Sequence, residues 1–328
     1  MLVNPGVHLL ELPLPLSLGS INVYLLQLNE GFLLIDCGMN TDASFDALDS
    51  AREGLGIEWR DIREILLTHI HPDHMGLAPR LLALTGARLS MHAADALLLA
   101  QIVAPDDRQR TDEQLVSAGS PPEMVAKTHR AFAEIGKNFR ELHPHTLLHG
   151  GEAIAIAEGI LEIVWTPGHS PGHLCLYERR RKLLFSGDHI LENLSPNVGW
   201  QPEDDPLGAY LQSLGKIAEL DIDLILPSHG APFSGHREWI ANTVAHHRER
   251  CDRILELLKE APKTAHTLAG ELWTRPLSPF HYRFAVYEVL AHLEYLRRLQ
   301  QVTTDNGKIT QWSALPQPPL AQQLAARR

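Results

Sequence analysis

The sequence predicts an α/β fold over residues 1–235, followed by a helical C-terminal region. Short apolar strands recur from the start: INVYLLQL and GFLLIDCG are separated by a polar break at Asn29–Gly31 that indicates a hairpin. Strands then alternate with helices, as in α/β proteins. Beyond His236 long helical patterns take over, and strand signals return only in VTTDNGKITQW.

Local signals define the elements of the first half. A helix is predicted from Thr41 to Gly54, with Thr41 or Asp42 near its cap, and REILLTH is predicted as a buried strand. HMGLAPRLLALTG is the next helix, and it stops at Gly86 because glycine readily ends helices. ARLSMH follows as a strand. A histidine-rich turn therefore comes directly after a buried strand.

Residues 95–147 differ from their flanks, because they have helical spacing and proline breaks without a strand signal. We interpret them as a helical insertion. Connections this long are usually functional or disordered, so we expect a cap that walls the substrate cleft. The residues expected to face substrate or core are Leu98, Ile102, Phe132 and Phe139. The alternative is a segment that covers an outer surface or forms a dimer contact.

The remaining strands are EAIAIA, LEIVWTPGH, GHLCLYER and KLLFSGDH, followed by a helix near Pro206–Leu220 and the strand DLILPSHG. Residues 236–312 contain three helices and then two short strands around Asp-Asn-Gly, a strong hairpin signal. This order suggests a winged-helix domain. Residues 313–328 are predicted to form a proline-rich tail.

Composition narrows the classes of function and location. The chain has 328 residues, with 29 basic and 40 acidic side chains, and the net charge of −11 does not indicate a phosphate-binding surface. Its three scattered cysteines imply no disulfide framework. The N-terminus lacks the basic region of a signal peptide, and no run reaches the roughly 18 apolar residues that cross a bilayer. We expect a cytoplasmic protein without membrane contact.

The stretch THIHPDH carries the first candidate metal ligands. His69 and His71 alternate at a strand end, so their side chains can point the same way, while Asp73 and His74 lie on the turn into the next helix. One turn cannot supply enough ligands for two tetrahedral sites. Three later strand ends each offer another ligand beside a glycine: His169, Asp188 and His229. This repeated context predicts a metal site.

The turn His69-Ile-His71-Pro-Asp73-His74 resembles the H-x-H-x-D-H signature of the metallo-β-lactamase superfamily, and the resemblance covers roughly residues 1–235. It implies an αββα sandwich, in which two mixed sheets pack face to face with helices outside. It also implies two metals bridged by Asp188, with His69, His71 and His169 holding one and Asp73, His74 and His229 holding the other.

The resemblance also narrows the branch of the superfamily. Asp188 is similar to the bridging aspartate of the glyoxalase II, lactonase and phosphodiesterase branches, which true zinc β-lactamases generally lack. Flavodiiron oxidoreductases of this fold carry glutamate where this chain has His71, and we expect no flavin domain, so the resemblance disfavours redox chemistry. The C-terminal part resembles the winged-helix extension of the branch that includes LACTB2-like proteins.

The implied chemistry is hydrolysis by two divalent ions, most simply zinc, with iron or manganese as alternatives. Two such ions about 3.5–4 Å apart can share a hydroxide that attacks an electrophilic carbonyl or phosphorus. Asp73 would ligate a metal and orient the nucleophile, and Asp188 would fix the metal separation. The residues considered for substrate contact are Tyr24, His189, Asn193 and Asn197.

Three functions remain open at this point. The favoured one is hydrolysis of a thioester, ester or lactone, with a small acyl compound as substrate. The second is a metal-dependent nuclease or phosphodiesterase, as among LACTB2-like proteins. The third is a metal-bearing binding protein without turnover, which the complete ligand set disfavours. The predicted third C-terminal helix, HYRFAVYEVLAHLEYLRRLQQ, is mostly apolar and lacks a basic face. It is better suited to packing against the catalytic domain or another subunit, as in a homodimer, than to binding nucleic acid.

Overall fold

The structure, a computed structural model, describes residues 1–15, 19–136, 142–193, 195–305 and 307–316. Backbone contacts divide the chain into two compact units. Unit 1 comprises Met1–Asp107, Phe132–Val198 and Ala209–Thr243, and unit 2 comprises Arg108–Ala131, Gly199–Gly208 and Val244–Arg328.

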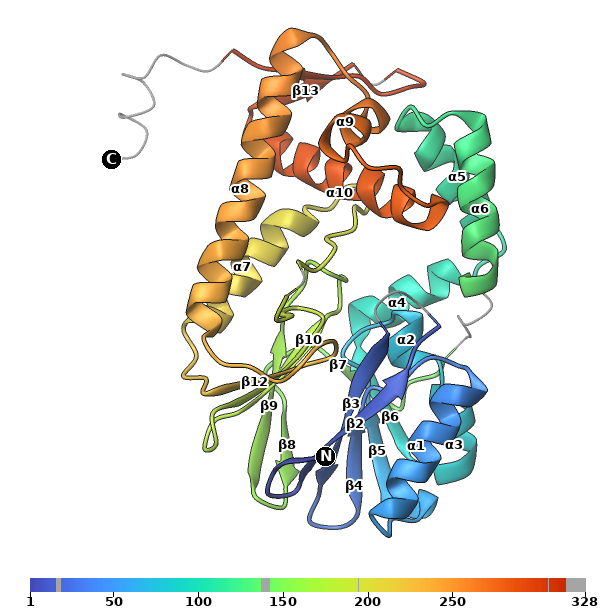
Figure 1. Cartoon of the computed structure of the whole chain (residues 1–328), viewed down its shortest axis with the longest axis vertical. Coiled ribbons are helices and arrows are strands. Elements are labelled where there is room, and N and C mark those ends of the chain that lie inside the picture. Colours follow the sequence, from blue (N-terminus) through green and yellow to red (C-terminus); the bar gives the residue numbers. More distant parts are fainter. Residues whose placement is uncertain (16–18, 137–141, 194, 306, 317–328) are drawn as a thin grey trace. The chain divides into compact units, whose positions relative to one another are not determined.

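Two mixed sheets form the framework of unit 1 (Figure 1). The first has seven strands in sequential order: β1 (Leu2–Asn4), β2 (Val7–Pro13), β3 (Ser20–Gln27), β4 (Phe32–Ile35), β5 (Ile62–Leu66), β6 (Arg88–His92) and β7 (Thr146–Leu148). The second has the order β12 (Leu224–Pro227), β11 (Leu183–Gly187), β10 (Leu174–Glu178), β9 (Gly159–Trp165) and β8 (Ala153–Ile156).

The apolar face of each sheet turns toward the other. Leu26 and Leu33 of the first sheet and Leu176 and Phe185 of the second belong to one buried cluster. A second cluster lies on the other face of the first sheet, where it joins strands to α1 (Asp42–Gly54), α3 (Ala78–Thr85) and α4 (Ala93–Ile102). The α/β sandwich predicted from the sequence is therefore confirmed.

Several local predictions hold in detail. β3 and β4 pair antiparallel, which confirms the hairpin. Thr41 caps α1 by accepting a hydrogen bond from the Ser44 amide. Gly86 ends α3 with a φ of 65°, a left-handed conformation that glycine adopts without steric cost. The short helix α2 (Pro72–Met75) forms the end of the histidine-rich turn and carries Asp73 and His74.

The predicted insertion differs from expectation in two ways. It does contain helices, but it ends in β7, which pairs parallel with β6; three residues are too few for a periodic strand signal. In addition, α5 (Asp107–Ser117) and most of α6 (Pro122–Gly136) group with unit 2. Leu98 and Ile102 pack against the unit 1 core. Phe132 is half-buried, whereas Phe139 lies outside the described residues. The role as a substrate cap stays a prediction.

Polar contacts join both α5 and α6 to the rest of unit 2; from α6, the Thr128 hydroxyl donates to the Pro279 carbonyl at 3.3 Å. The Tyr282 hydroxyl donates to Ser120 Oγ at 2.7 Å, and the Tyr287 hydroxyl donates to Gln114 Oε1 at 2.7 Å. The Thr310 amide donates to the Ser117 carbonyl at 2.8 Å. These bonds tie the insertion helices to the C-terminal helix and hairpin.

The C-terminal elements follow the predicted order of three helices and two strands. They are α8 (His236–Glu260), which begins in unit 1, then α9 (Ala265–Leu272), α10 (Pro279–Arg298), β13 (Val302–Thr304) and β14 (Trp312–Ala314). β13 and β14 pair antiparallel. β14 extends two residues into the predicted tail, and residues 317–328 lie outside the described part. The winged-helix assignment stays a prediction.

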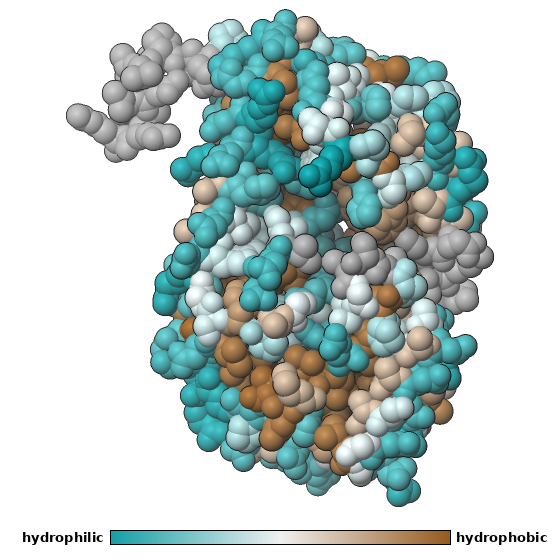
Figure 2. All heavy atoms as spheres, viewed as in Figure 1, coloured by the Kyte–Doolittle hydropathy of each residue, from teal (hydrophilic) through white to brown (hydrophobic). Residues whose placement is uncertain are grey.

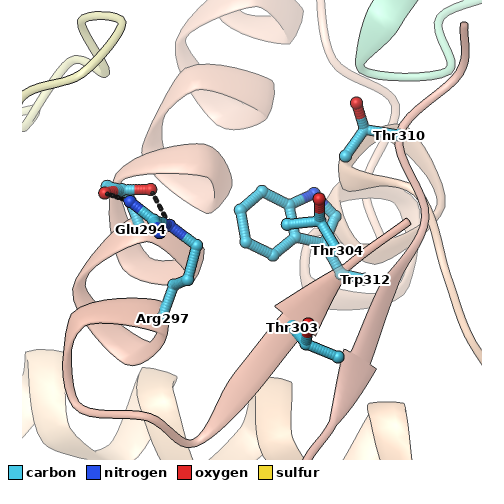
Figure 3. A pocket seen from close by; sticks show the side chains of 6 residues that line it. All are labelled: Glu294, Arg297, Thr303, Thr304, Thr310 and Trp312. Carbon is cyan, nitrogen blue, oxygen red and sulfur yellow. Dashed lines mark hydrogen bonds and ion pairs between the residues drawn. The ribbon is translucent and has the colours of Figure 1, made fainter. Parts of the chain in front are cut away.

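Two surface features complete the description. Figure 2 shows hydrophobic side chains gathered in the lower part of the view, where Figure 1 places the strands of unit 1. In unit 2, a hollow of about 350 Å³ is lined by Glu294, Arg297, Thr303, Thr304, Thr310 and Trp312 (Figure 3). None of the predicted metal ligands lines this hollow. No described helix combines the length and apolar character that a membrane span requires.

Candidate metal centre

Seven side chains from five places in unit 1 converge at strand ends. His69 and His71 follow β5, and Asp73 and His74 lie on α2. The others follow β9, β11 and β12. Their ligand atoms form two groups, within each of which the atoms lie no more than 4.8 Å apart: His69, His71, His169 and Asp188 in one, and Asp73, His74 and His229 in the other. The structure thus brings every predicted ligand into one of the two groups.

The first group has the spacing of a metal coordination shell. His69 Nε2 lies 2.9 Å from His71 Nδ1, and His169 Nε2 lies 3.2 Å and 3.0 Å from these two atoms. Tetrahedral zinc with Zn–N bonds of about 2.0–2.1 Å would separate its nitrogen ligands by about 3.3 Å. Three imidazoles therefore face a common point at a spacing close to that of a divalent cation's shell.

Asp188 faces both groups. Its Oδ2 lies 3.6 Å from His169 Nε2, while its Oδ1 lies 3.4 Å from His74 Nε2 and 3.5 Å from His229 Nε2. Asp73 Oδ2 lies 3.4 Å from His229 Nε2. One carboxylate therefore presents a separate oxygen to each group.

Several buried polar atoms of the centre have no hydrogen-bond partner: His74 Nε2, His229 Nε2 and Asp188 Oδ1. Leaving such atoms unsatisfied costs about 1–3 kcal/mol each, and native proteins rarely leave buried polar atoms unpaired. The three atoms lie together, so one cation would satisfy all of them. The donor set of imidazoles and carboxylates also suits zinc, iron or manganese. These residues therefore fit a divalent metal.

In three of the five histidines, the nitrogen on the far side of the ring makes a hydrogen bond to a carboxylate or carbonyl oxygen that fixes the ring's orientation. His74 Nδ1 donates to Asp36 Oδ2 at 2.8 Å, His169 Nδ1 to the Asn197 carbonyl at 2.8 Å, and His229 Nδ1 to the Ser20 carbonyl at 2.8 Å. A proton held on Nδ1 leaves the lone pair of the neutral ring on Nε2, facing the centre.

Asp36 is a functional residue that the sequence analysis did not identify. It follows β4 with a φ of 60° and is buried. Besides His74, it accepts hydrogen bonds from the amide and the hydroxyl of Thr68, both at 2.8 Å. It thus joins the end of β4 to the start of the histidine-rich turn. The available signal was an aspartate directly after an apolar strand, as at Asp188.

The two groups differ in electrostatics. In the first, burial lowers the pKa of His69 well below its usual value and that of His71 to about 3, so these rings are neutral at pH 7. In the second, burial opposes protonation of His74, but the carboxylates of Asp188, Asp36 and Asp73 hold its pKa well above the usual value. Metal binding to the second group must therefore displace protons.

The four residues considered for substrate contact lie in different settings. Tyr24 is buried, and its hydroxyl donates to the Pro227 carbonyl at 2.7 Å. His189 is buried with its ring edge against Tyr210. Burial argues against direct substrate contact for both. Asn193 is exposed. Asn197 is half-buried and acts on His169 through its main-chain carbonyl.

Comparison with known proteins supports this interpretation of the fold and site. A model of the metallo-beta-lactamase superfamily matches residues 16–229, and one of the metallo-beta-lactamase-like C-terminal domain matches residues 251–313. The crystal structure of a metallo-beta-lactamase family protein from Thermus thermophilus is 32% identical, with a TM-score of 0.83 over 96% of this chain and 100% of that one.

Two curated relatives carry names that describe an activity. The probable metallo-hydrolase YqjP of Bacillus subtilis is 26% identical over 92% of this chain and 96% of its own length. The acyl-coenzyme A thioesterase MBLAC2 of Gallus gallus is 25% identical over 66% of this chain and 74% of its own length.

Proposed function

The chain belongs to the metallo-beta-lactamase superfamily, and on that premise we propose that it is a hydrolase that binds two divalent cations and cleaves an acyl substrate. The substrate class is a thioester, an ester or a lactone. The single observation that carries the two-cation proposal is the placement of Asp188, because one of its oxygens faces each ligand group. Zinc is the proposed metal, with iron or manganese as alternatives.

Bound divalent cations lower the pKa of water toward about 7 and polarise a carbonyl oxygen. The chain's own residues prepare the site for this chemistry. His69, His71 and His169 present neutral nitrogens at a fixed spacing. Because His69 and His169 are buried and each is hydrogen-bonded through Nδ1, to the Thr68 hydroxyl and to the Asn197 carbonyl, their positions are set before a substrate arrives.

Asp73 is the proposed orienting residue. Burial opposes its ionisation, but His74 and His229 lower the pKa of Asp73 below the usual value, so the carboxylate is ionised at neutral pH. It lies beside His229 at the edge of the second group. An ionised carboxylate there can accept a hydrogen bond from an attacking water and so direct its lone pair.

Two observations favour an acyl substrate over nucleic acid. The net charge of −11 would repel a phosphate backbone. One relative with an assigned substrate class is a thioesterase. A small acyl compound is therefore the proposed substrate. A homodimer and a cytoplasmic location stay predictions from the sequence.

A substrate panel tests the proposal. The metal-loaded protein is assayed against acyl-coenzyme A thioesters, aryl esters, lactones, a phosphodiester and single-stranded RNA, with Asp188→Ala as the inactive control. We expect metal-dependent hydrolysis of at least one carbonyl substrate. Efficient RNA or phosphodiester cleavage without any carbonyl hydrolysis would instead establish the nuclease alternative.

A further inference from the structure

A buried carboxylate outside the ligand set links the two loops that carry the three histidines of the first group. Asp95 lies in the first turn of α4 and is fully buried. Its Oδ2 accepts hydrogen bonds from the Ile70 amide at 3.1 Å and the Ser170 hydroxyl at 2.8 Å. Its Oδ1 accepts one from the Gly172 amide at 2.6 Å. Asp95 itself is not a candidate ligand.

The three donors belong to two loops that are distant in sequence. Ile70 separates the ligands His69 and His71, and Ser170 directly follows the ligand His169. The nitrogens of these loops meet at 3.0–3.2 Å in the first group. We propose that Asp95 is a positioning residue that holds the two loops together and so sets the geometry of the three-histidine group.

The packing around Asp95 agrees with this role. A Cβ atom at Gly172 would lie 2.6 Å from the Asp95 amide nitrogen and 2.7 Å from its Cβ, so only glycine lets the second loop approach this closely. At the start of α4, His92 Nδ1 accepts a hydrogen bond from the Ala94 amide and caps the helix. The carboxylate therefore lies in a well-anchored first turn, where the helix dipole favours negative charge.

The ionisation state of Asp95 supports the same role. Burial raises the pKa of Asp95 to about 6, and its three hydrogen bonds oppose the rise, so the carboxylate is ionised at pH 7. A buried charge is costly unless it is well hydrogen-bonded. The Asp95 carboxylate accepts all three of its hydrogen bonds from Ile70, Ser170 and Gly172, which are adjacent to or near the proposed metal ligands.

The substitution Asp95→Asn tests the proposal without a change in size. The amide has one acceptor and one donor in place of two acceptors, so at least one backbone amide, Ile70 or Gly172, loses its acceptor in either orientation. Ser170→Ala is a milder variant that removes one of the three bonds and keeps the carboxylate. It keeps the proposal testable if Asp95→Asn does not fold.

Glu178→Gln is the matched control. Glu178 is a buried carboxylate of the same unit that also accepts three hydrogen bonds, one from the Arg180 amide and two from Arg181. It lies at the opposite end of β10 from the His169 loop. Its replacement should lower thermal stability as Asp95→Asn does, without affecting metal affinity.

The readout is zinc affinity, measured by competition between the apo-protein and a chromophoric chelator. The inference rests on the metal binding of the proposed function but not on its substrate. For Asp95→Asn we expect the dissociation constant of one zinc site to rise by about tenfold or more. Ser170→Ala should shift it by a few-fold in the same direction, and Glu178→Gln should leave it unchanged.

Two results separate the possible failures. Unchanged zinc affinity in both Asp95→Asn and Ser170→Ala, beside a wild type that binds zinc, would overturn the positioning role while leaving the proposed function intact. A wild type that binds no divalent metal at all would overturn the proposed function itself, and the positioning role with it.

Discussion

Unit 1 and unit 2 both bury histidines, but they use them in opposite ways. In unit 2, His247 Nδ1 of α8 lies 3.1 Å from His292 Nε2 of α10, and His292 Nδ1 donates to the Glu288 carbonyl. The two rings thus bond to each other. In unit 1, the rings bond outward to Asp36 and to main-chain carbonyls, and their other nitrogens converge with carboxylates.

This difference shows what distinguishes a metal centre from a histidine-rich core. In unit 2 the nearby Glu288 carboxylate instead pairs with Arg250 at 2.9 Å. Within the described residues, the groups that could hold a metal ion all lie in unit 1. Convergence of ring nitrogens with a carboxylate, rather than the number of histidines, is therefore the informative feature.

The largest expected effect comes from removing the residue that both groups share. Asp188→Ala should lower kcat/KM by more than about 100-fold, because even residues behind metal ligands contribute 10–100-fold. The matched change in the other unit, His292→Gln, should leave turnover within about twofold. Steady-state kinetics at saturating metal measure both, and an active Asp188→Ala enzyme would contradict the bridging role.

Asp36→Asn should have the next largest effect. An asparagine side chain carries no charge and cannot orient the His74 ring through a charged hydrogen bond as the Asp36 carboxylate does. Zinc affinity should therefore fall by about 10–100-fold. Asp42→Asn, on the exposed side of α1, is the control and should bind zinc like the wild type. Isothermal titration of the apo-proteins measures this. Equal affinities in the two variants would show that Asp36 only supports the fold.

Metal removal should destabilise one unit and spare the other. A metal present at 100 times its dissociation constant stabilises the state that binds it by about 2.7 kcal/mol. Chelation should therefore speed hydrogen exchange around the ends of β5, β9, β11 and β12, while the unit 2 parts of α8 and α10 exchange at unchanged rates. Uniform acceleration in both units would contradict a metal centre confined to unit 1.

The smallest expected effect concerns the acid sensitivity of unit 2. Burial lowers the pKa of His247 to about 4 and that of His292 to about 3. Both rings are neutral in the fold and gain protons on unfolding, so their contribution to stability is complete above about pH 6.5 and is lost as the pH falls toward these values. Glu288 acts in the opposite sense, since burial raises its pKa.

His292→Gln should accordingly weaken the pH dependence. The denaturant midpoint of unit 2 is measured by hydrogen exchange at pH 7 and at pH 5. In the wild type this midpoint should be lower at pH 5 than at pH 7. The fall should be smaller in the variant. An identical pH dependence in both proteins would mean that this histidine pair does not control the acid response.

The sequence identified ligands more readily than their supports. His69, His71, Asp73 and His74 occupy one short turn, and three later strand ends each offer a further ligand beside a glycine, so local patterns together indicated a metal site. Asp36 acts on a histidine 38 positions away, a proximity that only the pairing of β4 with β5 creates. The carbonyls of Ser20 and Asn197 could not be predicted at all, because every residue carries a carbonyl.

The fold shows the same limit. Short apolar runs predicted most strands of the two sheets, and β10 and β11 are indeed buried along their whole length, whereas β7 has only three residues and shows no such run. The helical insertion was recognised by its spacing. Its grouping with the C-terminal helices depends on side-chain pairs such as Tyr282 with Ser120, which are 162 positions apart in the sequence. Contacts between residues so far apart in the sequence produce no local sequence pattern, so they could not be predicted.

Metal stoichiometry tests the central claim most directly. Purified wild-type protein, saturated with zinc and freed of excess metal, is analysed by elemental mass spectrometry beside Asp188→Ala. We predict two zinc ions per wild-type chain and a clear loss in the variant. At most one ion per fully loaded wild-type chain would contradict a shared two-cation centre.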